Sequence, residues 1–153
     1  MQPGATSLPT PFTAEQIKHA CPAGRTLRML VEQAGEPPQR QVNRFDEVDE
    51  GGCVIESWAE RPDGSRTPAE RTDATWVELQ MHGSFPADRT EHERVLLTTP
   101  LGELLCDRYT VTGEKVMTYW FDVGRPGMPV LYEHRTGDDP ELTVTVLSDE
   151  VVS

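Results

Sequence analysis

Apolar and polar residues alternate along much of the chain with a period of two, which is the repeat of a β-strand. Leu27, Met29 and Val31 alternate with mostly polar residues and predict a strand over residues 25–32. The same pattern predicts strands over residues 42–48, 53–60, 93–99, 104–112, 116–123, 130–135 and 142–147, with a weaker one over residues 65–71. Glycine- and proline-containing turns separate these segments. Because turns this short join antiparallel strands, we expect an antiparallel sheet.

Two short helices interrupt the strands. Thr13 and Gln16 form a capping-box pattern, which predicts a helix over residues 14–21. Trp76 begins the apolar stripe of a second predicted helix over residues 73–82. The order of elements predicts an α+β fold, a curved antiparallel β-sheet (half-barrel) of 7–9 strands with two short helices.

The residues before the first helix have a different composition. Residues 2–11 contain three prolines, one glycine and small polar residues. We therefore expect residues 1–12 to form an extended Pro-rich arm, with residues 2–11 outside the core, and residues 13–153 to form a single α+β domain. The arm lacks the basic start and apolar segment of a secretory signal, which favours a cytoplasmic protein. A periplasmic or lipid-anchored protein is the alternative, if a signal was removed.

The charge of the chain restricts its partners. The formal net charge is −12, and a chain this acidic repels phosphate backbones, which excludes a nucleic-acid-binding role. No apolar run reaches the roughly 18 residues of a membrane helix, so we expect no membrane insertion. The sequence leaves the oligomeric state open.

Few residues suggest catalysis or metal binding. The cysteines are odd in number and form no Cys-x-x-Cys pair, so buried free thiols are expected at Cys21, Cys53 and Cys106. The four histidines lie on four different predicted elements: His19, His82, His92 and His134. No Gly-x-Ser-x-Gly motif and no phosphate-binding glycine loop occur. The sequence predicts no catalytic residue, no metal site and no cofactor.

A run of turns and strands in the C-terminal half resembles a known group. Residues 99–109 begin with the turn Thr-Pro-Leu-Gly, and the aromatic strand 119–123 and the turn Gly-Met-Pro-Val at 127–130 follow. About 35 residues here resemble uncharacterised bacterial proteins grouped with the lipoprotein-carrier (LolA-like) half-barrels. The resemblance implies a curved antiparallel sheet with helices on its concave side, and it carries over no catalytic residue.

The strand over residues 116–123 has large apolar residues on both faces, which indicates that both faces of the central strands are covered. In one interpretation, the helices cover one face of the sheet and the curvature of the sheet closes the other. In the other, Trp58, Trp120 and Tyr132 line an apolar pocket for a ligand.

Three functions remain open. The first is a non-enzymatic binding module that holds an apolar small molecule, a lipid chain or an apolar peptide in the hollow of the sheet. The second is a protein-interaction or assembly subunit that docks through a sheet edge or an apolar face. The third is a pathway enzyme on the same fold, because a fold does not by itself determine a function.

Overall fold

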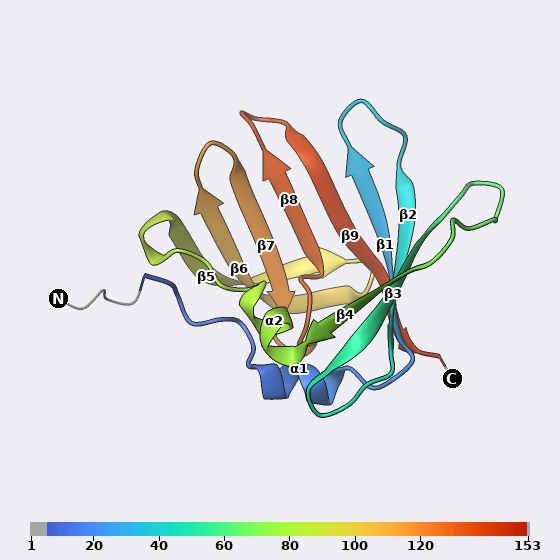
Figure 1. Ribbon diagram of the computed structural model, residues 1–153. Helices are drawn as coiled ribbons and strands as arrows, with labels where there is room; N and C mark the ends of the chain where they lie inside the picture. Colours follow the sequence, from blue (N-terminus) through green and yellow to red (C-terminus); the bar gives the residue numbers. More distant parts are fainter. Residues whose placement is uncertain (1–5, 153) are drawn as a thin grey trace.

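The computed structural model describes residues 6–152, and within them nine strands form one open antiparallel sheet (Figure 1). The strands are β1 (Arg25–Gln33), β2 (Gln39–Asp46), β3 (Gly52–Glu60), β4 (Glu70–Thr75), β5 (Thr90–Thr99), β6 (Gly102–Thr112), β7 (Val116–Asp122), β8 (Leu131–Arg135) and β9 (Pro140–Val151). Two α-helices accompany them, α1 (Ala14–Ala20) and α2 (Trp76–Met81), with a 3-10 turn at Ala87–Arg89. The predicted α+β class and curved antiparallel sheet are confirmed.

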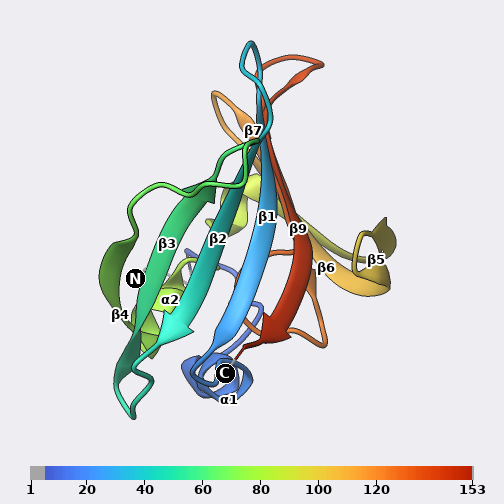
Figure 2. The same ribbon diagram turned by 90° about the vertical axis from the view of Figure 1, so that its right-hand side faces the viewer.

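Two meanders meet in the middle of the sheet. The strand order is β4-β3-β2-β1-β9-β8-β7-β6-β5, so the first and last strands of the chain pair with each other. Strands β1 and β9 pair from Arg25 opposite Val151 to Gln33 opposite Leu142, with one register shift after Arg28. Figure 2 shows this seam together with the curvature of the sheet. Because β1 and β9 join the two meanders in the middle, β4 and β5 are the two edge strands of the sheet.

Both helices begin with a capping box. In α1, the Thr13 hydroxyl accepts a hydrogen bond from the backbone N–H of Gln16, and the Gln16 side chain accepts one from the N–H of Thr13. In α2, Thr75 and Glu78 form the same reciprocal pair. The sequence predicted α2 to begin near residue 73, but residues 70–75 form strand β4. The helix begins later because Thr75, not Thr72 or Asp73, supplies the cap.

The core lies between one face of the sheet and the two helices. Ile17 of α1 and Trp76 of α2 are buried against alternate residues of the strands, among them Leu27, Phe121 and Val144. Both helices lie near one end of the strands (Figures 1 and 2), so they cover only part of the concave face. No helix within residues 6–152 is long and apolar enough to cross a membrane.

The described part of the N-terminal arm packs against the domain. The N–H of Leu8 donates to the carbonyl of Phe85 at 2.9 Å, and the N–H of Ala87 donates to the carbonyl of Thr6 at 2.8 Å. Phe12 is buried in the core, and Leu8 packs against it. The prediction that residues 2–11 stay outside the core was wrong for Leu8, whose side chain packs against the buried cluster. Residues 1–5 of the predicted arm lie outside the described residues.

Candidate functional site

A cavity of about 430 Å³ lies between the concave face of the sheet and the N-terminal arm, α1 and α2, which together form its cover. The sheet contributes Leu27, Phe45, Ile55, Tyr119, Phe121 and Tyr132 to its lining. The cover contributes Phe12, Ile17 and Leu79 from the arm, α1 and α2. Although charged residues make up 26% of the chain, the lining contains no Asp, Glu, Lys or Arg among residues 6–152. The wall of the cavity is therefore mostly apolar and carries none of the four charged residue types.

The more exposed lining residues of the cavity are more polar than the buried ones. Phe45 and Phe121 are buried, whereas Tyr119, Tyr132 and His134 are half-buried. The two tyrosine rings stack with centroids 5.8 Å apart, and the His134 ring lies 5.9 Å from that of Tyr132. Burial raises the pKa of both tyrosine hydroxyls, which keeps them protonated at neutral pH. They are thus neutral hydrogen-bond donors at the rim of an apolar cavity.

A row of stacked rings stiffens this wall. Phe85, from the segment after α2, lies 5.0 Å from Tyr109 on one side and 5.0 Å from Tyr119 on the other. His92 stacks on the outer side of Tyr109 at 4.5 Å, with the rings within 10° of parallel. Large rings packed on both sides are fixed in place. The polar rim of the cavity is therefore held by packing that reaches strand β5.

The cover is held together by one amide side chain. Gln80 of α2 donates from Nε2 to the Thr10 hydroxyl at 3.0 Å and accepts at Oε1 from the N–H of Ala14 at 2.9 Å. Pro11 packs against Gly83, two residues beyond the end of α2, where an added Cβ would approach the proline Cδ to 2.7 Å. Glycine is needed at this position because any side chain would push the arm away. The arm, α1 and α2 therefore form one connected cover.

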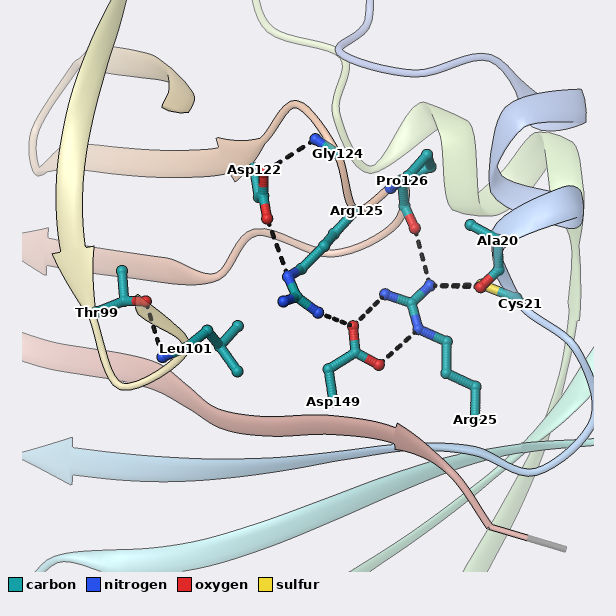
Figure 3. Close-up of polar contacts among 10 residues, drawn as sticks. All are labelled: Ala20, Cys21, Arg25, Thr99, Leu101, Asp122, Gly124, Arg125, Pro126 and Asp149. Carbon is teal, nitrogen blue, oxygen red and sulfur yellow. Dashed lines mark hydrogen bonds and ion pairs between the residues drawn. The ribbon is translucent and has the colours of Figure 1, made fainter. Parts of the chain in front are cut away.

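A buried ion-pair network holds the loop that completes the cavity (Figure 3). Asp149 accepts hydrogen bonds from Arg25 Nε at 3.0 Å and Nη2 at 2.8 Å, and a further bond from Arg125 Nη1 at 3.3 Å. Arg125 Nε also lies 2.9 Å from a carboxylate oxygen of Asp122. Arg25 Nη1 donates to the carbonyl of Pro126 at 2.9 Å, next to the loop residues that line the cavity. These charges neutralise one another and serve to position the loop.

Of the three residues predicted to line a pocket, the structure places only Tyr132 there. Trp58 and Trp120 lie outside the lining because the side chains of a strand alternate between faces. Trp120 lies between the cavity residues Tyr119 and Phe121, and therefore points to the opposite face. Trp58 is buried on that face beneath the Arg66 guanidinium, 4.6 Å from its ring centroid.

Several lining residues were not recognised in the sequence. Phe45 could have been found, because it is the one aromatic residue of the strand predicted over residues 42–48. Met128 and Pro129 lie in a turn that was noted only as part of the resemblance. Gln80 has no sequence signal, because its partners lie 66 and 70 residues away.

The structure describes no cluster of ionisable groups arranged for metal binding. Within residues 6–152, no three His, Cys, Asp or Glu side chains lie close enough to hold a metal ion. The three cysteines are buried and unpaired.

The thiols are expected to be unreactive in the folded protein. Burial raises the pKa of the Cys53 and Cys106 thiols to about 11, and burial is also the main cause that raises the pKa of Cys21. Since the thiolate is the reactive form, a thiol reagent at about pH 8 should react slowly with native protein. In denaturant it should count three thiols, with or without a reductant. Fewer than three without reductant would contradict the unpaired state.

Comparison with known proteins adds no assignment to this geometry. No family model matches the chain, and no curated protein matches it. The cavity and its surroundings therefore carry the functional argument.

Proposed function

We propose that the protein is a non-enzymatic binding protein that holds one apolar small molecule or lipid chain in the cavity of its curved sheet. The observation that carries this proposal is the apolar cavity of about 430 Å³ with an uncharged lining. Small-molecule sites are typically cavities of roughly 300–1,000 Å³ with apolar walls and a few polar groups. The hydroxyls of Tyr119 and Tyr132 and the ring of His134 are such groups.

The lining favours a single chain or compact molecule over a peptide. Each peptide unit brings an N–H and a C=O, and burying them without partners costs about 1–3 kcal/mol each. The apolar depth of the cavity, with Ile17, Leu27 and Phe121, offers no side-chain partner for such groups. A ligand with an apolar body and one polar end fits better, with the polar end at the tyrosines.

The proposal is tested by titration with Nile red, a neutral dye whose fluorescence rises in apolar surroundings. We expect saturable binding that long-chain alcohols displace. Ile55→Trp places a large ring in the cavity and should weaken dye binding by about tenfold or more, a cost of about 1.4 kcal/mol per factor of ten. Trp58 and Trp120 are poor reporters of binding, because they lie on the other face of the sheet.

Val54→Trp is the matched control. Val54 is the neighbour of Ile55 on β3, is also half-buried, and points to the opposite face. This variant should bind the dye as the unmodified protein does. The proposal fails if the unmodified protein shows no saturable binding, or if both tryptophan variants weaken it equally.

A further inference from the structure

The outer edge of β5 has features of a protein interface. This ten-residue strand ends the sheet, and no described strand pairs with its outer side. Long edge strands are usually protected by charged side chains, lysine above all, or by proline or a bulge. Residues 90–99 contain no lysine or proline, and their pairing with β6 has no register shift. The opposite edge, β4, is shorter and has charged residues along most of its length, whereas the charged residues of β5 (Glu91, Glu93 and Arg94) lie in its first half.

An apolar run occupies the middle of this edge. Val95, Leu96 and Leu97 follow one another, and the Leu96 side chain is 68% exposed. Leu105 lies directly opposite Leu96 on β6, on the same face, and is 41% exposed. Exposed leucines that are neighbours across a ladder form a patch at the end of the sheet. An occupant of this edge must therefore offer both a strand and apolar side chains.

We propose that this occupant is a second copy of the chain, paired antiparallel through β5 with Leu96 opposite its own copy. The two sheets then become one continuous sheet across a two-fold axis. Such an axis, perpendicular to the sheet, places one residue of β5 opposite the same residue of the second copy. With Leu96 at the centre, Val95 lies opposite Leu97 of the second copy. Each member of the apolar run then meets only apolar residues.

The same register is compatible with the charges of the strand. It places Arg94 opposite Thr98 of the second copy, and Glu93 opposite Thr99. No like charges face each other, and this matters because opposed like charges destabilise a strand pair. On one face, Leu105, Leu96 and their two copies form a continuous row of four leucines across the junction.

Neighbouring registers fit less well. Centring the pair on Val95 would set Leu96 against Arg94 of the second copy and Leu97 against Glu93. Centring it on Leu97 would set the rest of the apolar run against threonines. An axis that passes midway between two neighbouring residues is excluded. It would place residues that point to different faces opposite each other, whereas paired residues must point to the same face.

The first test is the mass in solution, measured by sedimentation equilibrium at several concentrations. We expect twice the mass of a single chain at high concentration. Because each copy carries a net charge of −12, added salt should strengthen the association. Leu96→Glu places two carboxylates opposite each other at the axis and should give single chains. A monomer at all concentrations and salt levels would overturn the proposal.

Met81→Glu is the matched control. Met81 is 53% exposed on α2, away from β5, so its replacement should leave the dimer intact. Circular dichroism verifies that both variants fold. Equal loss of the dimer in both would show that a general increase in negative charge, and not the β5 register, controls association.

A cysteine scan tests the register itself. Directly opposite residues have Cβ atoms about 4.5–5.5 Å apart, near the separation that a disulfide spans. Leu96→Cys should therefore cross-link two chains under mild oxidation. Thr98→Cys should not, because its two copies would lie about 13 Å apart along the strands. Equal cross-linking, or cross-linking of Thr98→Cys alone, would overturn the proposed register. The inference does not depend on the cavity having a ligand.

Discussion

Replacement of Asp149 with alanine is expected to lower the free energy of unfolding by about 3–5 kcal/mol, the cost of leaving a buried charge without its partner. The side chains of Arg25 and Asp149 are 7% and 9% exposed, and two hydrogen bonds of 3.0 and 2.8 Å join them. Without the carboxylate, the Arg25 guanidinium stays buried and loses its counter-charge. Urea denaturation provides the measurement, and an unchanged m-value verifies that the same surface unfolds.

Glu60→Ala is the control for this variant. It breaks the ion pair between Arg28 and Glu60, whose side chains are 39% and 34% exposed. Exposed pairs contribute about 0–1 kcal/mol, so the loss should be small. Similar losses in both variants would mean that the Asp149 network is hydrated and not a buried structural element.

The network also predicts how stability changes with pH. Burial alone would raise the pKa of the Asp149 carboxyl, but the hydrogen bonds and charges of Arg25 and Arg125 outweigh it and hold the pKa below its usual value. A carboxyl with a lowered pKa in the folded state adds stability above its unfolded pKa of about 3.9. This stability is lost as the pH falls through the folded pKa. Asp149→Asn should therefore lose less stability than the unmodified protein below about pH 4.

Local signals were sufficient to predict most of the fold. Alternation with a period of two located the long strands, and glycine and proline located their turns. The reciprocal hydrogen bonds of Thr13 and Gln16 were predicted because both partners lie within four residues of each other. Strand β4 was misplaced because Glu70–Thr75 has neither alternation nor apolar residues of any size. These residues form a strand because they pair with β3, and not because of a pattern in their own sequence.

Long-range contacts explain what the sequence could not predict about the site. The pairing of β1 with β9 joins residues more than 100 positions apart, and no local pattern indicates it. The face that carries the cavity was ambiguous in β7, because Trp120 is as large and apolar as Tyr119 or Phe121. The position of α1, α2 and the arm decides between the two faces, and contacts such as that of Gln80 with Thr10 fix that position.

Phe121→Ala is expected to destabilise the protein by about 3–5 kcal/mol, the range for truncation of a core aromatic residue. The Phe121 ring is buried and lies 6.2, 6.3 and 5.8 Å from the rings of Phe12, Phe85 and Tyr109. Its removal would join new empty space to a cavity that is already present, so the neighbouring rings can relax only in part. Thermal or urea unfolding measures the loss.

Trp120→Ala is the comparison that decides which face of β7 is the core. Trp120 is the larger side chain, so a loss that followed size alone would be greater for Trp120→Ala. It is only half-buried, however, and lies on the face away from the cavity, so its truncation removes fewer buried contacts. We therefore expect the smaller loss for Trp120→Ala. A loss under about 1 kcal/mol for Phe121→Ala, with a larger one for Trp120→Ala, would place the core on the opposite face, because large core truncations cost several times that amount.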